Sequence, residues 1–318
     1  MKGQPVKAMK KVSIMVPCYN EEENVVAISE AIIGQMEALP QYDYDIMFID
    51  NCSTDNTRPL LRKLCAENKR IKAILNVRNF GQFRSPYYGL CQTTGDCAIS
   101  ICADFQDPVE MIPVFLKHWE EGYQIVYGVK TSSQESKLMY GLRSMYYKLI
   151  KRFSSVDQIE HFTGFGLYDR SFLDVMRSLH DPTPFLRGIV AELGGRHLEI
   201  PYEQPRRRAG KTHNNWYTLY DAAMLSFTSY TKIGLRMATL LGTGIALVSF
   251  IIALVYLVYK LLHWNSFDAG TAPILIGMFF LGAILLVFLG IIGEYILTIN
   301  ERVMNRPLVV EEERLNFD

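Results

Sequence analysis

The chain has 318 residues, of which 49% are hydrophobic, and its 33 basic and 33 acidic side chains give a formal net charge of zero. This balance gives no support to a general nucleic-acid binder, because such a binding domain is usually strongly basic. The six cysteines, at positions 18, 52, 65, 91, 97 and 102, form no C-x-x-C pair. Reduced, buried thiols are therefore favoured over a disulfide or zinc framework, and this part of the chain is expected in the cytoplasm.

Short β-rich apolar runs alternate with helical stretches up to about residue 127. The strand-like runs are 12–16, 46–50, 71–75, 97–103 and 124–127. This alternation predicts βαβ units around a mostly parallel sheet, in which ligands bind at the carboxyl ends of the strands. Polar segments follow the first four runs, at 17–21, 50–55, 76–82 and 104–108. We therefore expect one ligand site along this edge of the sheet.

Three later segments indicate contact with a membrane. The run 137–152, KLMYGLRSMYYKLIKR, has the composition of a helix in a lipid headgroup region, although an ordinary amphipathic surface helix shows the same pattern. The runs 237–259 and 272–292 contain no charged residue. Each exceeds the about 20 residues that a helix needs to cross about 30 Å of hydrocarbon. We expect two membrane spans, the second reaching residue 297, rather than a buried helical pair.

Charges that flank these runs set their orientation. The connector 261–271 has no Lys or Arg. The outer flanks carry Lys232, Arg236, Arg302 and Arg306. By the positive-inside rule, both termini are then cytoplasmic and the connector lies outside. Glycines in both runs would let the helices approach closely, but whether the protein forms a homo-oligomer stays open.

Five motifs follow one another along the chain. They are VPCYNEEENV at 16–25, IDNCSTDNT at 49–57, RNFGQ at 78–82, ADFQDP at 103–108 and RRRAGKT at 206–212. Together with the two apolar runs, they resemble family 2 glycosyltransferases of the polyprenyl-phosphate type, such as dolichyl-phosphate mannose synthases and bactoprenol glucosyltransferases. The resemblance extends from about residue 11 to residue 307. It implies an α/β GT-A (Rossmann-like) fold, inverting transfer of a single sugar, and a divalent cation, Mg²⁺ or Mn²⁺.

The resemblance also implies how the chain is divided. Residues 1–232 would form a cytoplasmic GT-A domain with interfacial helices, 233–300 would hold the two transmembrane helices, and 301–318 would be a cytoplasmic tail. An integral protein of the bacterial inner membrane is expected. Its partners would be a nucleotide-sugar, a polyprenyl-phosphate lipid and the membrane, but no nucleic acid.

The ADFQDP motif supplies the candidate catalytic centre. Asp104 and Gln106 are two residues apart and can both turn an oxygen towards one hard cation. We predict that these two residues hold the metal and, with Asp107, form the catalytic centre. A solvated acidic turn that ends at Pro108 is the alternative interpretation.

The motifs after the first three strands supply candidate donor-binding residues. Asp50 and Asn51 resemble the acidic pair that contacts base and ribose in the family, and Gly81 suits a tight turn under the nucleotide. Asn20 could also cap a helix. The predicted donor-binding residues are Pro17, Tyr19, Asn20, Glu21, Asp50, Asn51, Asn79, Gly81 and Asp104.

The RRRAGKT motif is the densest basic cluster, formed by Arg206, Arg207, Arg208 and Lys211. Arginine forks match phosphate oxygens, so the cluster could hold the donor pyrophosphate or the lipid phosphate. A patch attracted to anionic lipid is the alternative. The predicted phosphate-binding and acceptor-binding residues are Arg143, Arg170, Arg187, Arg206, Arg208 and Lys211.

Two positions depart from the family pattern. Cys102 stands where many relatives have the first aspartate of a D-x-D metal motif, and a soft thiol suits Mg²⁺ poorly. Gly164 stands where many relatives have an acidic residue, a candidate base, so no base is assigned. A lipid phosphate, with a second pKa of about 6, is largely ionised at neutral pH and serves as its own nucleophile. The missing carboxylate therefore favours a phosphate acceptor over an alcohol.

The expected reaction is transfer of one sugar, first of all glucose from a uridine donor, to a polyprenyl phosphate such as undecaprenyl phosphate at the cytoplasmic membrane face. Mannose from a guanosine donor is next. Two alternatives stay open at this point. One is a glycosyltransferase that decorates a glycolipid or cell-surface polymer, and the other is a catalytically silent membrane scaffold.

Overall fold

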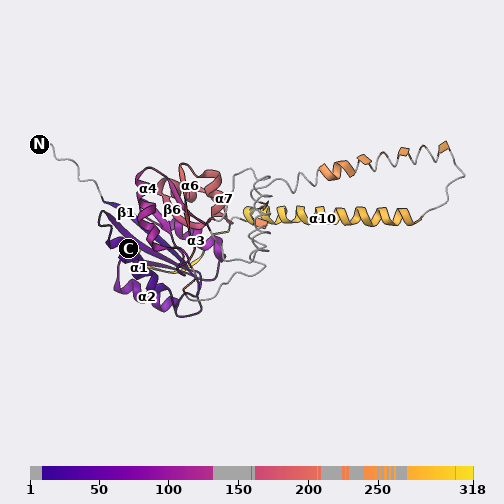
Figure 1. Cartoon of the computed structure of the whole chain (residues 1–318). Helices are drawn as coiled ribbons and strands as arrows, with labels where there is room; N and C mark the ends of the chain where they lie inside the picture. Colours follow the sequence, from indigo (N-terminus) through magenta and orange to yellow (C-terminus); the bar gives the residue numbers. More distant parts are fainter. Residues whose placement is uncertain are drawn as a thin grey trace.

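A twisted sheet organises the globular part of the chain in a computed structural model that describes residues 9–131, 159, 162–205, 207–208, 271–304 and 306–317, with scattered positions between 224 and 262. Within these residues the sheet has eight strands in the order β7-β5-β6-β4-β1-β2-β3-β8 (Figure 1). The strands are β1 (Lys10–Cys18), β2 (Tyr42–Asp50), β3 (Ile71–Asn76), β4 (Cys97–Ser100), β5 (Ile125–Lys130), β6 (Phe162–Asp169), β7 (His197–Tyr202) and β8 (Glu311–Leu315).

The middle of this sheet is parallel, as the alternation predicts. β1 pairs in parallel with β2 and β4, and β2 pairs in parallel with β3. β6 runs antiparallel between β4 and β5, whereas β5 and β7 are parallel. The carboxyl ends of β1 to β4 therefore meet at one edge, together with the beginning of β6.

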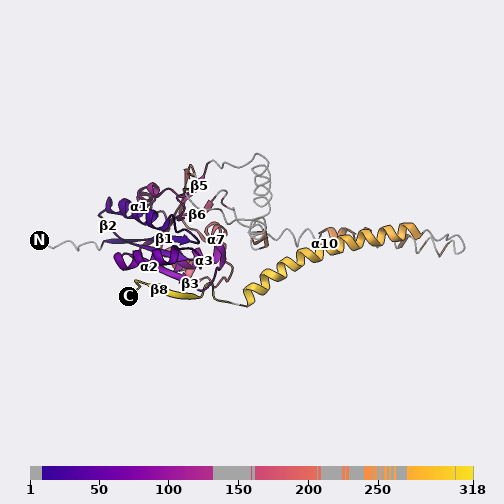
Figure 2. The same ribbon diagram turned by 90° about the horizontal axis from the view of Figure 1, so that it is seen from below.

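Helices cover both faces of the sheet (Figure 2). They are α1 (Val25–Glu37), α2 (Thr57–Glu67), α3 (Gly81–Gln92), the 3₁₀ turn η1 (Val109–Met111), α4 (Ile112–Glu120), α6 (Arg170–Ser178) and α7 (Leu186–Leu193). Successive strand residues point to opposite faces, so Ile14 and Met15 of β1 enter different apolar clusters. α1, α2 and α4 complete the first cluster, and α3, α6 and α7 complete the second.

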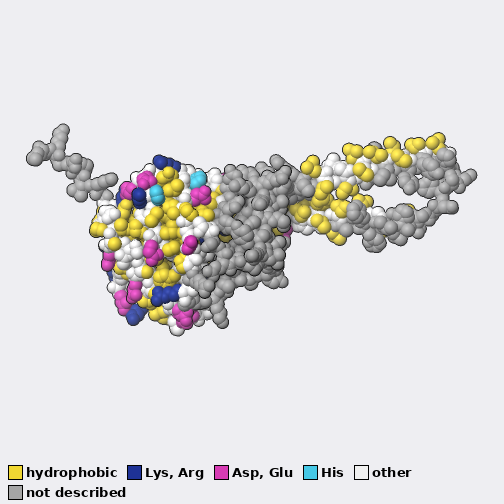
Figure 3. All heavy atoms as spheres, in the orientation of Figure 1, with side chains coloured by type: hydrophobic (Ala, Val, Ile, Leu, Met, Phe, Trp, Pro, Cys, Tyr) yellow, Lys and Arg dark blue, Asp and Glu magenta, His cyan; other side chains and the backbone are white. Residues whose placement is uncertain are grey.

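A long helix, α10 (Thr271–Val303), projects from the globular part (Figure 1). Its 33 residues extend about 50 Å at 1.5 Å per residue, more than the hydrocarbon thickness of a bilayer. Within the part of the chain that the structure describes, its segment Ile284–Val303 is the one helix long and apolar enough to cross a membrane. Large side chains of α10 such as Leu285 and Leu286 are exposed, and Figure 3 shows hydrophobic side chains on the part of the projecting segment next to the globular part.

The predicted run 272–297 is thus a helix. The other predicted span, 237–259, lies largely outside the described residues, as does the basic run 137–152.

The C-terminal segment returns to the globular part after α10. β8 pairs antiparallel with β3, with Ala73 opposite Leu315 and Leu75 opposite Glu313, and forms the edge of the sheet (Figure 2). The sequence predicts only a tail at 301–318, because a strand that reads EEERL lacks the apolar alternation of a half-buried strand. The structure instead makes residues 311–315 part of the sheet of the predicted GT-A domain.

Candidate active site

The loops at the carboxyl edge of the sheet are joined by direct hydrogen bonds. The backbone nitrogen of Asn20, after β1, donates to Ser53 Oγ, after β2, at 2.8 Å. The backbone nitrogen of Thr54 donates back to Asn20 Oδ1 at 2.8 Å. Asn20 adopts φ +55°, a left-handed conformation that asparagine tolerates better than most residues. The structure therefore confirms that the first two polar motifs share one edge.

The residues on either side of Asn20 in the first motif also lie at the carboxyl edge of the sheet. Pro17 is the penultimate residue of β1, opposite Ile49 of β2, and Tyr19 is half-buried in the turn that follows. Glu21 is buried and accepts a hydrogen bond from Asn24 Nδ2 at 2.6 Å. Burial raises the pKa of Glu21, although the Asn24 hydrogen bond and the charge of Arg207 act in the opposite direction.

Asp50 ends β2 and is fully buried. Both of its carboxylate oxygens accept from the backbone nitrogen of Ser53, at 3.2 and 3.1 Å. Arg58 Nε donates to Asp50 Oδ2 at 2.7 Å. Asp50 therefore stabilises the turn between β2 and Ser53 at the carboxyl edge of the sheet.

Asn51 connects the second polar motif with the third. Its Nδ2 donates to Asn79 Oδ1 at 2.9 Å and to the carbonyl of Gly81 at 3.2 Å, and its Oδ1 accepts from the backbone nitrogen of Phe80 at 2.8 Å. Gly81 has φ +88° with open space where a Cβ would lie, so its conformation and not crowding favours glycine. Hydrogen bonds from Asn51 thus connect the turn after β2 with Asn79 and Gly81 in the loop after β3.

Asp104 follows β4 and is 5% exposed. Its Oδ1 accepts from the backbone nitrogen of Gln106 at 3.0 Å, and its Oδ2 lies 2.8 Å from Arg207 Nη2. Arg207 Nη1 lies 3.9 Å from Glu21 Oε1. The backbone nitrogen of Arg208 donates to the carbonyl of Asp104 at 3.3 Å. Arg207 and Arg208 therefore both contact Asp104, the candidate metal ligand.

Asp107 stabilises the turn that contains Asp104. It is 3% exposed, and its carboxylate accepts from the backbone nitrogen of Cys102 at 3.0 Å and from the hydroxyl of Tyr202 at 3.2 Å. Burial raises the pKa of Asp107 and that of the Cys102 thiol. A protonated thiol is a poor ligand for a hard cation, so Cys102 is not expected to bind Mg²⁺.

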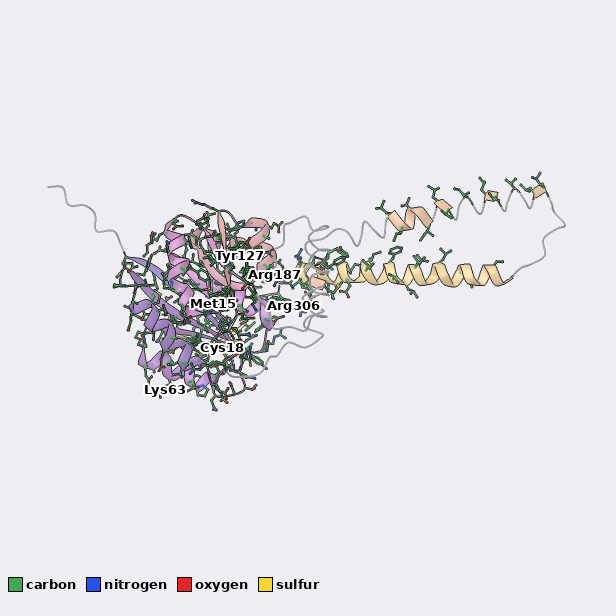
Figure 4. All side chains as sticks on the ribbon, in the orientation of Figure 1. Met15, Cys18, Lys63, Tyr127, Arg187 and Arg306 are labelled. Carbon is green, nitrogen blue, oxygen red and sulfur yellow. The ribbon has the colours of Figure 1, made fainter. Side chains whose placement is uncertain are left out.

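The structure separates the other predicted phosphate ligands. Arg170 begins α6 and donates to the carbonyls of Thr93 and Gly95 before β4, so it lies at the opposite edge of the sheet. Arg187 lies over the ring of Phe185, at the side of the globular part that faces α10 (Figure 4). Three further candidates, Arg143, Arg206 and Lys211, fall outside the described residues.

Gly164 lies near the beginning of β6, at the candidate site's edge of the sheet. Its φ of +100° is strained for any residue with a Cβ, and a Cβ would lie 3.5 Å from Leu186 Cδ2. A carboxylate at this position would therefore strain the backbone. In this conformation, position 164 therefore favours glycine over an acidic residue.

The carboxylate of Asp104 is the kind of oxygen ligand that a hard cation prefers, and Gln106 lies in the same turn, where its backbone nitrogen donates to Asp104 Oδ1. Within the described residues, no group of three or more His, Cys, Asp or Glu side chains is arranged so that it could hold a metal ion. Phosphate oxygens of a bound nucleotide would have to complete the coordination shell.

Comparison with known proteins matches residues 13–177 to the model of glycosyl transferase family 2. The chain is 31% identical to an uncharacterized glycosyltransferase of Synechocystis over 94% of its length and 93% of the relative. It is 29% identical to the bactoprenol glucosyl transferase of Shigella phage SfX over 96% of its length and 99% of that protein. The chain belongs to glycosyltransferase family 2, and the protein is a glycosyltransferase.

Solved structures also align with part of the chain. Glucosyl-3-phosphoglycerate synthase from Mycobacterium tuberculosis matches 70% of this chain and 79% of its own, at 17% identity and a TM-score of 0.49. Mannosyl-3-phosphoglycerate synthase from Rubrobacter xylanophilus matches 68% and 71%, at 20% identity and a TM-score of 0.48.

Proposed function

We propose that the protein is an inverting glycosyltransferase that moves one sugar from a nucleotide-sugar to a polyprenyl phosphate at the cytoplasmic face of the bacterial inner membrane. The observation that carries this proposal is the contact of Asp104 with Arg207 at 2.8 Å, at the edge where the polar loops meet. A carboxylate suited to a cation then lies beside a guanidinium suited to phosphate oxygens. A pyrophosphate leaving group requires both.

Asp104 and Gln106 would hold Mg²⁺ or Mn²⁺ together with phosphate oxygens of the donor. The cation, when bound, supplies charge stabilisation for the departing nucleotide diphosphate. The connected loops around Asn20 and Asn51 provide the wall against which the nucleoside would bind.

In the proposed reaction, an oxygen of the lipid phosphate attacks the anomeric carbon from the face opposite the leaving group. The bond between that carbon and the diphosphate oxygen breaks, so the configuration inverts and a nucleotide diphosphate leaves. Arg207 would stabilise the negative charge that develops on the diphosphate. Because the acceptor phosphate is already ionised at neutral pH, no protein base is required, in agreement with glycine at position 164.

The end of α10 contacts the region around the candidate site. Arg84 in the first turn of α3 lies 3.9 Å from Glu301, and Arg302 lies 3.5 Å from Asp181. Figure 4 places Arg187 and Arg306 on the same side of the globular part, towards α10. This arrangement supports delivery of an acceptor phosphate from a membrane that surrounds α10.

The relatives support the acceptor class. Proteins named bactoprenol glucosyl transferase, among them the prophage homolog of Escherichia coli at 30% identity over 90% of this chain, align over nearly their whole length. We therefore propose undecaprenyl phosphate as the acceptor and glucose from UDP-glucose as the first donor to test, with GDP-mannose next.

The test is nucleotide diphosphate release by the full-length protein in vesicles, with and without undecaprenyl phosphate and Mg²⁺. We expect release that requires both the lipid and the cation. Release with a glycolipid or polymer acceptor instead would redirect the acceptor. No release with any donor would contradict an enzymatic role.

A further inference from the structure

The C-terminal strand β8 reaches the candidate donor site through one arginine. Arg58, on α2, is 15% exposed, and each part of its guanidinium has a partner. Nε donates to Asp50 Oδ2 at 2.7 Å, Nη1 donates to Glu312 Oε2 at 2.9 Å, and Nη2 donates to the carbonyl of Asn76. The fork therefore ties together the ends of β2 and β3 and the strand β8.

Asp50 transmits this contact to the loops of the site. Its carboxylate holds the backbone nitrogen of Ser53, and Ser53 Oγ accepts from the backbone nitrogen of Asn20. Between Asp50 and Ser53, Cys52 adopts φ +65°. A non-glycine residue in this conformation persists only when its surroundings hold it there. The geometry of both loops therefore depends on Asp50 and on what fixes Asp50.

We propose that Glu312 is a positioning residue of the donor site: through Arg58 and Asp50 it holds the turn after β2 in the conformation that binds the nucleotide. This inference rests on the proposed function, because it assigns those loops to a nucleotide-sugar. Eight residues separate Glu312 from Val303, the last residue of α10. The segment that follows α10 would therefore contribute to the donor site.

A second salt bridge on β8 provides a matched control. Glu313 binds Arg62, one turn after Arg58 on α2, with Oε2 2.7 Å from Nη2. Both glutamates lie on β8 and both partners lie on α2, but the structure gives Arg62 no contact with Asp50. Replacing either glutamate therefore removes one salt bridge between β8 and α2. Only the replacement of Glu312 also removes a contact that leads, through Arg58 and Asp50, to the donor loops.

Solvent screens both pairs in part, because Glu312 is 48% exposed and Glu313 is 36% exposed. The expected effect of Glu312→Gln is therefore moderate, about two- to fivefold weaker binding of a nucleotide diphosphate. Arg58→Lys keeps a positive charge but loses the fork that reaches three partners, so it should weaken binding at least as much.

The experiment measures the dissociation constants of UDP and GDP for the full-length protein with Mg²⁺, together with thermal unfolding. We expect Glu312→Gln to weaken binding of the preferred nucleotide about two- to fivefold and Glu313→Gln to change that affinity less than about twofold, with similar unfolding temperatures for the two variants. Glu312→Gln should add little to Arg58→Lys, because both act through one contact chain.

Two results would overturn the inference. One is equal weakening by Glu312→Gln and Glu313→Gln, which would show a general effect of β8 on stability. The other is unchanged affinity in Glu312→Gln while the wild-type protein binds the nucleotide. Wild-type protein that binds neither nucleotide would overturn the proposed function itself, and this inference with it.

Discussion

Arg207 Nη2 lies 2.8 Å from Asp104 Oδ2, so an arginine of the RRRAGKT motif contacts the carboxylate that the sequence predicts as the metal ligand. The carbonyl of Asp104 also accepts a hydrogen bond from the backbone nitrogen of Arg208. The candidate cation site and the candidate phosphate-binding loop are therefore one unit. Binding of a cation and of the donor phosphates would rearrange this contact, because the cation would compete with Arg207 for Asp104 and the phosphates would compete with Asp104 for Arg207.

Asp104→Asn removes a charge with little change in shape. We expect turnover with Mg²⁺ or Mn²⁺ to fall about a hundredfold or more while thermal unfolding stays close to wild type, because the carboxylate serves the cation and not the core. Steady-state rates with both metals check this. An active Asp104→Asn enzyme would remove the metal assignment.

Cys102→Ser is the companion change to Asp104→Asn. Burial keeps the pKa of the Cys102 thiol well above its usual range, so we expect a neutral thiol that serine replaces with a mild effect on turnover. A severe loss in Cys102→Ser, with a preference for Zn²⁺ over Mg²⁺, would show instead that the thiolate binds the metal.

Arg207→Ala should weaken recognition of the donor far more than folding. The side chain contacts Asp104 and lies near Glu21 on a loop, so little core packing is lost. We expect the KM for the donor to rise about tenfold, in line with the loss of a charge-assisted hydrogen bond. Arg196→Ala, which removes an arginine stacked on Tyr123, is the control. Equal losses of stability and activity in Arg207→Ala would support a structural role.

The predicted phosphate ligands on either side of Arg207 can be tested together. The sequence predicts that replacing Arg206 and Arg208 with alanine weakens phosphate recognition more than folding. Arg208 Cζ lies 5.1 Å from the centre of the Phe105 ring, beside Asp104. A pair of binding and unfolding measurements on this double variant separates the two effects. A fall in unfolding temperature that matches the fall in affinity would contradict the prediction.

Asp45 provides a pH-dependent test of stability away from the site. Burial alone would raise the pKa of Asp45, but hydrogen bonds from Lys11 and Ser13 and the charges of Lys11 and Lys72 lower it. A lowered pKa stabilises the fold above the usual carboxyl pKa of about 4, and this stability is lost as the pH falls through the folded-state pKa.

We therefore expect Asp45→Asn to cost about 2 kcal/mol of unfolding free energy at pH 7, since it leaves two lysines without their buried partner. The difference from wild type should shrink below about pH 4. Asp43→Asn, which removes a half-exposed partner of Arg70, should cost less than about 1 kcal/mol. A difference for Asp45→Asn that stays constant down to pH 3 would contradict this account.

A chain that ends at Lys232 should act poorly on lipid in vesicles, because it lacks the apolar segments. The sequence alone predicts that this fragment folds and binds nucleotide. The structure adds that it also lacks β8, so we expect weaker nucleotide binding than in the full chain. A chain that ends at Pro307 keeps α10 but loses β8, and separates the two effects. Full activity of the Lys232 fragment on long-chain lipid would refute an anchoring role.

The shared edge of the polar motifs could be predicted from the sequence, because parallel strands bring their carboxyl ends together. The partners within that edge could not. Nothing in the spacing shows that Asn51 reaches Asn79, or that the guanidinium of Arg207 contacts the carboxylate of Asp104. Those choices depend on loop conformations, which a run of three arginines leaves undetermined.

Two further features depend on contacts between residues far apart in the sequence. Arg170 occurs in a polar turn like the other candidates, but the antiparallel direction of β6 carries it to the opposite edge of the sheet. Glu312 lies in a charged segment that resembles a solvated tail, and only its contact with Arg58, 254 residues earlier, shows its place.

The most direct test of the central claim is the product formed by the full-length protein from UDP-glucose or GDP-mannose and undecaprenyl phosphate in Mg²⁺-containing vesicles. The account predicts a lipid that gains a single hexose with inverted anomeric configuration, one nucleotide diphosphate for each lipid formed, and loss of both products in Asp104→Asn. Sugar transfer without lipid phosphate, retention of configuration, or undiminished product from Asp104→Asn would contradict it.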